Sequence, residues 1–122
     1  MLFRSYQAWK RGWRCLLSPS SRVVHKHRAT SSRFSHRYVD ETTRRNLFLF
    51  VWKNVTGWRM TASHILNLPR IHGQQWMAGN SSAELRAYAR ALARLPLALA
   101  RRIHSSVNYV CSDEEVLKRS CS

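Results

Sequence analysis

The clearest periodic pattern of apolar residues lies between residues 82 and 107. Apolar side chains recur there at steps of three and four, which places them on one face of a helix. They are Leu85, Tyr88, Leu92, Leu95 and Leu99. Ser81 and Glu84 stand three apart ahead of this stripe, which is the spacing of a capping box. Pro96 interrupts the pattern, because proline has no N–H and clashes with the preceding turn, so we predict two helices, roughly 82–95 and 97–107, or one bent helix.

Residues 44–55 form a second apolar segment. Its large side chains fall at helical spacing, at Leu47, Phe48, Val51, Trp52 and Val55. Residues 40–43 supply two acids and two hydroxyls, which are typical of a helix N-terminus, and Gly57 is expected to end the helix. The uninterrupted block 47–52 also fits a buried strand. The start and stop signals favour the helix.

The middle of the chain predicts a short helix followed by a loop. Residues 61–68 form the helix, and Pro69 is expected to end it. Residues 69–80 contain glycines and polar side chains, which indicates a loop. Trp76 and Met77 within this loop are expected to anchor it on the core or, alternatively, on a partner protein.

The first seventeen residues have the pattern of a cationic amphipathic helix. On a helical wheel the apolar side chains gather in one arc, which contains Leu2, Phe3, Tyr6, Trp9, Trp13, Leu16 and Leu17. Arginines lie opposite this arc, at Arg4, Arg11 and Arg14. Lys10 alone intrudes on the apolar edge. Pro19 then breaks the pattern, and residues 22–38 are basic and irregular.

Together these elements predict a mainly α-helical protein: a small body of three to four short helices with a basic, largely irregular N-terminal extension. We divide the chain into the extension (residues 1–39), a helical domain (40–110) and a C-terminal tail (111–122). The tail predicts one final helical turn capped by Ser112. A chain of 122 residues holds one small domain. Such a body buries a small fraction of its surface, so we expect a partner to stabilise it.

The charge distribution indicates what the N-terminal extension does. Residues 1–39 carry nine arginines and lysines and no acid, within a chain of formal net charge +15. Arginine-rich, serine-rich and acid-poor composition is typical of a mitochondrial targeting segment. Three alternatives remain: a helix lying on an anionic membrane, a retained arm that binds phosphates, and a solvated tail.

Arginines on the last long helical segment are the best candidates for contacts with RNA. Arg86, Arg90 and Arg94 are spaced four apart, so they line up on one helix face. Arginine forms bidentate bonds with phosphate groups. The predicted RNA-binding set adds residues of the extension and consists of Arg22, Lys26, Arg28, Arg33, Arg37, Arg86, Arg90 and Arg94. The alternative is an ordinary solvated face.

The sequence shows little sign of a metal site or of an enzyme active site. His25 and His27, with His36 and Cys15, match no metal-ligand spacing, and His64 is expected to be packed or solvated. No glycine-rich phosphate loop or nucleophile motif occurs. No apolar run reaches the roughly twenty residues that span a bilayer. We therefore expect no enzyme activity, cofactor, bound metal, small-molecule substrate or transmembrane span.

These features predict a structural RNA-binding component of a mitochondrial ribonucleoprotein in the matrix. The first candidate is the mitochondrial ribosome, with ribosomal RNA and neighbouring proteins as partners. The alternative is a peripheral accessory or assembly subunit of an inner-membrane respiratory or ATP synthase complex, with peripheral membrane contact. A basic membrane-active peptide without a defined core is a third reading. The predicted partner-packing residues are Trp76, Met77, Leu85, Tyr88 and Leu92. The RNA element, and whether residues 1–39 are cleaved, stay open.

Overall fold

The protein is built from α-helices. The computed structural model describes residues 2–16, 18–22, 24, 33–79 and 81–120, and over these it contains six helices and no strand. The helices are α1 (Leu2–Lys10), α2 (His36–Asn54), α3 (Trp58–Met77), α4 (Ser81–Leu92), α5 (Leu95–Ser106) and α6 (Asp113–Ser120). The mainly α prediction is confirmed, although α2 and α3 are longer than expected. None of the described helices is long and apolar enough to cross a membrane.

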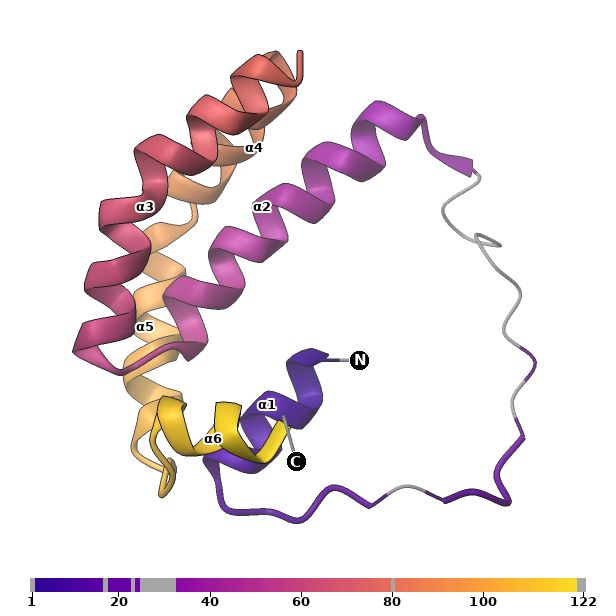
Figure 1. Cartoon of the computed structure of the whole chain (residues 1–122), viewed down its shortest axis with the longest axis vertical. Coiled ribbons are helices and arrows are strands. Elements are labelled where there is room, and N and C mark those ends of the chain that lie inside the picture. The colour runs from indigo at the N-terminus through magenta and orange to yellow at the C-terminus, as the bar shows by residue number, and fades with distance from the viewer. Residues whose placement is uncertain (1, 17, 23, 25–32, 80, 121–122) are drawn as a thin grey trace.

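The helices form one bundle with a smaller pair at its end. Helix α2 packs across α4 and α5, and α3 packs along α4. Figure 1 shows α3 and α4 running side by side, with α6 next to α1 at the lower end. The first and last helices therefore meet, although they lie at opposite ends of the sequence.

Helix α2 confirms the helical interpretation of residues 47–52 and ends within one residue of the predicted end, but it begins before the predicted start. The helix is capped by Ser35, whose hydroxyl accepts the backbone N–H of Tyr38 at 3.3 Å. Glu41 therefore lies inside the helix, beyond its first turn, and forms ion pairs with arginines there. The helix ends at Asn54, and Gly57 instead caps the start of α3 with an ordinary φ of −63°.

Helix α3 continues through Pro69, so the predicted short helix and loop are wrong. Proline removes one backbone hydrogen bond, but the turns beyond it are stabilised by contacts with other helices. Gln75 accepts a hydrogen bond from Arg44, and His72 packs on Tyr88. Tertiary contacts of this kind supply most of the stability of protein helices.

Helices α4 and α5 confirm the division near Pro96. Helix α4 ends at Leu92, and Pro96 lies in the first turn of α5, where its missing N–H costs nothing. The buried face of α4 is its alanine face: Ala87 and Ala91 are completely buried, whereas Leu85 is 69% exposed. Small side chains let α4 approach α2 closely.

Helix α6 is longer than the single turn predicted. Its cap is a reciprocal pair: the Ser112 hydroxyl accepts the Glu115 backbone N–H at 3.2 Å, and the Glu115 carboxylate accepts the Ser112 N–H at 2.7 Å. The predicted capping role of Ser112 is confirmed. The capping box predicted at residue 81 is not formed by Glu84, whose oxygens bond to other helices; the Ser81 side chain lies outside the described residues.

Helix α1 is attached to the bundle through a buried carboxylate. Lys10, the residue that interrupted the apolar arc, is only 1% exposed, and its ammonium lies 2.7 Å from Asp113. The Tyr6 hydroxyl donates to the same carboxylate, which also accepts the backbone N–H groups of Thr56, at 2.9 Å, and Gly57. One acid therefore joins α1, α6 and the connection between α2 and α3.

These donors keep Asp113 ionised. Burial raises the pKa of the carboxyl, but the bonds from Lys10, Tyr6 and the Gly57 backbone outweigh it and hold the pKa below its ordinary value. Burial and the bond to Asp113 raise the pKa of Tyr6, so its hydroxyl stays protonated. A buried ion pair of this kind is costly to break, because the remaining charge has no compensation.

The closely packed α2–α4 contact predicts that Ala87→Leu destabilises the fold. The added side chain has no room at a completely buried position, and overpacking costs about 1–3 kcal/mol. Ala89→Leu, on the exposed side of the same helix, is the matched control and is expected to change stability by less than about 0.5 kcal/mol. Urea unfolding measures both. Equal effects of the two substitutions would contradict the assignment of the buried face.

The buried pair predicts strong coupling between Lys10 and Asp113. Lys10→Met and Asp113→Asn are each expected to lower the free energy of unfolding by about 3–5 kcal/mol, since each strands the other charge. The double variant should lose clearly less than the sum. Arg101→Met, at an exposed position, is the control. Additive losses would show that the two side chains do not interact.

The same pair predicts a pH dependence. Because the pKa of Asp113 is lower in the folded chain than its ordinary value of about 3.9, its contribution is fully present above that value. It is lost as the pH falls through the folded pKa. The difference in unfolding free energy between the natural chain and Asp113→Asn should be constant above about pH 5 and shrink below about pH 4. A difference that grows on acidification would contradict this assignment.

Candidate nucleic-acid interface

Most acidic residues of this protein bond groups within the fold. Of its six acids, three are buried, with exposures of 4% for Glu41, 4% for Glu84 and 1% for Asp113. Asp40 bonds Arg44 one turn away, and Glu115 caps α6. The negative charge is thus largely used within the fold, while most arginines remain at the surface.

Three arginines converge on Glu41 where α2 crosses α4. Arg86 Nε lies 2.6 Å from one carboxylate oxygen and Arg37 Nε lies 3.2 Å from the same oxygen. Arg90 Nη1 lies 3.0 Å from the other oxygen. We call Arg37, Glu41, Arg86 and Arg90 the Glu41 cluster. Its carboxylate is 5% exposed, whereas the side chains of Arg86, Arg90 and Arg37 are 35%, 51% and 67% exposed.

The Glu41 cluster carries a positive charge. The hydrogen bond from Arg86 lowers the pKa of Glu41 most; desolvation opposes it, and the bond from Arg37 adds to the lowering. The carboxylate therefore stays ionised at neutral pH. Three guanidinium groups against one carboxylate leave a local charge of +2. This charge is presented to solvent from two helices.

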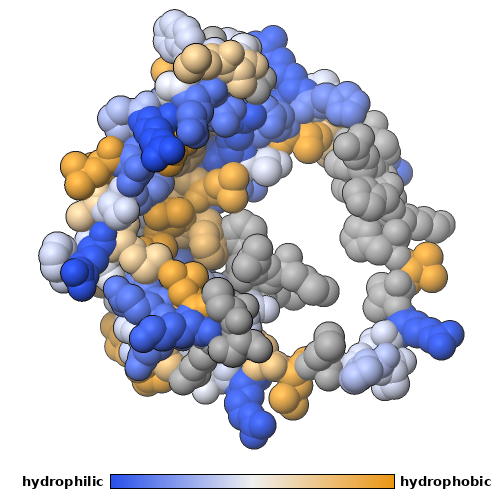
Figure 2. Space-filling model, in the orientation of Figure 1, coloured by the Kyte–Doolittle hydropathy of each residue, from blue (hydrophilic) through white to orange (hydrophobic). Residues whose placement is uncertain are grey.

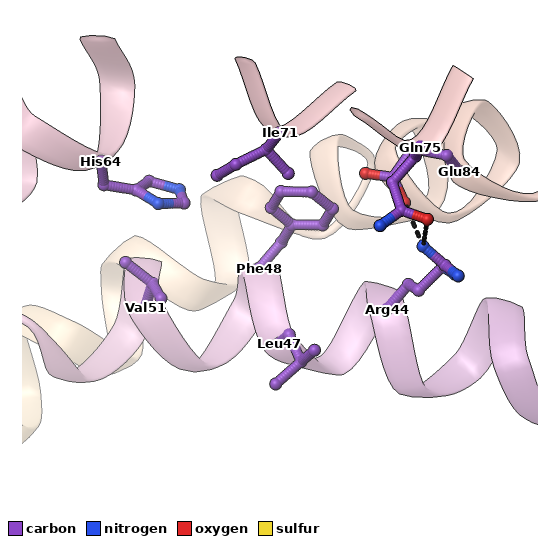
Figure 3. Close-up of a pocket in the computed structure, with 8 residues that line it drawn as sticks. All are labelled: Arg44, Leu47, Phe48, Val51, His64, Ile71, Gln75 and Glu84. Atoms are coloured by element: carbon purple, nitrogen blue, oxygen red, sulfur yellow. Dashed lines mark hydrogen bonds and ion pairs between the residues drawn. The ribbon is translucent and has the colours of Figure 1, made fainter. Parts of the chain in front are cut away.

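A second ion-pair group links the same two helices, but here the arginine is on α2 and the glutamate is on α4. Arg44 on α2 bonds Glu84 on α4 at 3.1 Å and also donates to Gln75 on α3. His72 Nδ1 lies 3.2 Å from the other oxygen of Glu84. Figure 3 shows Arg44, Gln75 and Glu84 meeting beside the Phe48 ring. The Arg44 side chain is only 19% exposed, so this group mainly holds the helices together, and Arg44, Gln75 and Glu84 also line the pocket of about 290 Å³ drawn in Figure 3.

Aromatic rings fill the space behind this ion-pair group. Phe48 packs edge-on against Tyr88, with ring centres 5.2 Å apart, and Tyr88 packs edge-on against His72 at 4.6 Å. His64 accepts the indole N–H of Trp52 at 3.2 Å, and burial lowers its pKa. His64 is thus a packed histidine. Over the described part of the chain, no group of three histidine, cysteine or acidic side chains is placed to hold a metal ion.

The structure brings some of the predicted RNA-binding residues together and leaves others apart. Arg86 and Arg90 lie together as expected, and Arg37 joins them through Glu41. Arg94 is exposed but follows the end of α4, so it does not extend the row as a third helical residue. Arg22 and Arg33 are also exposed. Lys26 and Arg28 lie outside the described residues.

The predicted partner-packing residues mostly lie at the surface. Trp76 is 74% exposed and Met77 is 90% exposed, so the expectation that they anchor a loop on the core is wrong. Continuation of α3 through Pro69 carries this end of the helix beyond the core. Leu85 and Leu92 are 69% and 42% exposed, whereas Tyr88 packs against Phe48.

Between α3 and α4 lies an apolar cavity of about 470 Å³, lined by His72, Trp76, Ser82, Glu84, Leu85 and Tyr88. Figure 2 shows apolar side chains also gathered in the left half of the viewed face, with hydrophilic ones above and below them. Apolar surface is therefore exposed at more than one place.

The sequence contained half of the signal for the Glu41 cluster. Arg37 and Glu41 are four residues apart, which predicts an ion pair on one helix. Nothing in the spacing indicates that Arg86 and Arg90 reach the same carboxylate, because their separation from Glu41 along the chain exceeds forty residues. Comparison with known proteins gives no matching family model, no matching curated protein and no matching solved structure.

Proposed function

We propose that this chain is a structural RNA-binding component of a mitochondrial ribonucleoprotein, with the mitochondrial ribosome as the first candidate. The observation that carries the proposal is the separation of charge: the buried acids orient cations from within, and arginines dominate the outer surface. Such a surface attracts a polyanion. The role is architectural and involves no catalysis.

RNA binding by this chain would rest on phosphate contacts. Each arginine that neutralises a phosphate releases condensed counterions, so binding weakens steeply with salt. Arg14, Arg22 and Arg33 of the N-terminal extension are exposed and add to the positive surface that can follow an RNA backbone. Sequence-specific contacts with bases are not part of this proposal.

In this proposal the N-terminal helix is both an address and a part of the fold. Its basic amphipathic pattern is suited to mitochondrial import before folding. Removing it afterwards would strip Asp113 of Lys10 and Tyr6 and cost about 3–5 kcal/mol. That is a large share of the roughly 5–15 kcal/mol available to a small domain. We therefore expect residues 1–39 to remain attached.

A peripheral subunit of an inner-membrane complex is the second candidate. The supporting observation is the cavity of about 470 Å³ lined in part by Trp76 and Leu85, both strongly exposed. Exposed apolar surface of this kind is typical of a protein–protein contact. Here the arginines would meet acidic subunits or lipid headgroups.

Sedimentation of a mitochondrial detergent lysate is expected to place the tagged chain with ribosomal subunits. Ribonuclease treatment should then shift it to light fractions, because its binding depends on RNA. A respiratory-complex subunit followed in the same gradient is the control and should not move. If the chain migrates with respiratory complexes and ribonuclease does not change its position, the second candidate is favoured and the first is overturned.

Mass spectrometry of the chain purified from mitochondria is expected to recover peptides from residues 1–11 in proportion to those from α2 and α4. A matrix protein with a removable presequence serves as the control for active processing. A mature chain that begins after residue 24, with no α1 peptide bound, would contradict the retention of α1.

A further inference from the structure

The Glu41 cluster holds three partly exposed guanidinium groups against one buried carboxylate. We propose that it binds phosphodiester groups of the RNA backbone, with Glu41 as the residue that positions the three guanidinium groups. This inference rests on the proposed function and names the surface that carries it. The sequence predicted a row of arginines on one helix. The proposed site instead combines arginines from α2 and α4.

The hydrogen-bond pattern leaves donors for a phosphate. Arg37 and Arg86 contact Glu41 through Nε, and Arg90 does so through Nη1. Arg86 also donates from Nη2 to Ser82 at 3.2 Å. A guanidinium group has five N–H donors, so most donors of these arginines are not used by the described protein atoms. Because the side chains are one-third to two-thirds exposed, these donors reach solvent.

The buried carboxylate makes the arginines better ligands for phosphate. A free arginine side chain carries about 2 kcal/mol of rotamer entropy that binding must overcome. Glu41 already restricts three such side chains, and their local charge of +2 remains favourable for an anion. Guanidinium groups also match the two free oxygens of a phosphodiester in a bidentate arrangement. Fixed geometry and fork-shaped donors distinguish this site from a diffuse basic patch.

Further exposed arginines at the ends of α2 and α4 favour a polyanion over a single phosphate. Exposed Arg33 precedes α2, so it lies at the same end of that helix as Arg37. Exposed Arg94 follows the end of α4. Arg86 and Arg90 are one helical turn apart, and their guanidinium groups converge on the two oxygens of one carboxylate. Arg33 and Arg94 supply exposed positive charge that further phosphates of the same strand can meet.

The test measures binding of the full chain to a fluorescent single-stranded RNA 20-mer over a series of salt concentrations. The first variant is R37Q/R86Q/R90Q. It should bind at least tenfold more weakly and lower the slope of log affinity against log salt by about 2, at about 0.7 per lost contact. The matched control, R59Q/R70Q/R101Q, removes the same charge from exposed positions outside the cluster. It is expected to change the slope by less than half as much.

Two further variants separate geometry from charge. R37K/R86K/R90K keeps every charge and the partners of Glu41, so it should fold, yet it should bind several-fold more weakly because lysine lacks the fork of donors. Glu41→Gln raises the net charge by one. It should nevertheless weaken binding, because the arginines lose the group that orients them. Thermal unfolding of each variant shows that the compared chains are folded.

The outcomes distinguish this inference from the proposed function. If the natural chain binds RNA and the cluster variants bind like the matched control, the cluster is not the site, although RNA binding stands. Unchanged affinity in the lysine variant, or tighter binding by Glu41→Gln, would likewise overturn the positioning role. If the natural chain binds no RNA at low salt but binds phosphatidylglycerol vesicles, both the proposed function and the RNA site fail.

Discussion

Buried carboxylates that each bond several groups from different helices hold this protein together. The chain has twenty-one arginines and lysines but only six acids, and the three buried acids each bond several groups. Glu41 and Glu84 join α2 to α4, and Asp113 joins α1 and α6 to the α2–α3 connection. A buried charge without a partner costs several kcal/mol, and this penalty disfavours any arrangement that separates these helices.

The apolar core alone would define the helix packing less well. Its most buried members on α4 are alanines, which allow close approach but offer little side-chain shape, and large residues such as Leu85 and Trp76 remain exposed. Crossed ion pairs of opposite polarity, Glu41 with Arg86 and Arg44 with Glu84, therefore fix how α2 and α4 are aligned. The exposed apolar surface is consistent with a chain that gains stability from a partner.

Burial separates arginines that hold the fold from arginines that can meet a ligand. Arg44 and Arg86 each bond a buried glutamate, but the side chain of Arg44 is 19% exposed and that of Arg86 is 35% exposed. Arg37 and Arg90 are more open still. In the proposed RNA-binding role, the interactions that align α2 with α4 also orient these outward donors. Structure and function would then share one set of bonds.

The sequence by itself determined the features that depend on neighbours along the chain. Periodicity predicted the helical class, Pro96 the division of α4 from α5, and Ser112 the cap of α6, because each acts within a few residues. Only the tertiary structure decided that α3 continues through Pro69, that Lys10 is buried against Asp113, and that Arg86 shares Glu41 with Arg37. These outcomes depend on partners that lie well outside the local turn of helix, 31 residues away for Gln75 and Arg44 and 103 for Lys10 and Asp113, where spacing carries no signal. Burial changes the role of these charges. A charged side chain that the sequence predicts to be solvated stabilises the fold when it is buried together with an opposite charge from a distant part of the chain.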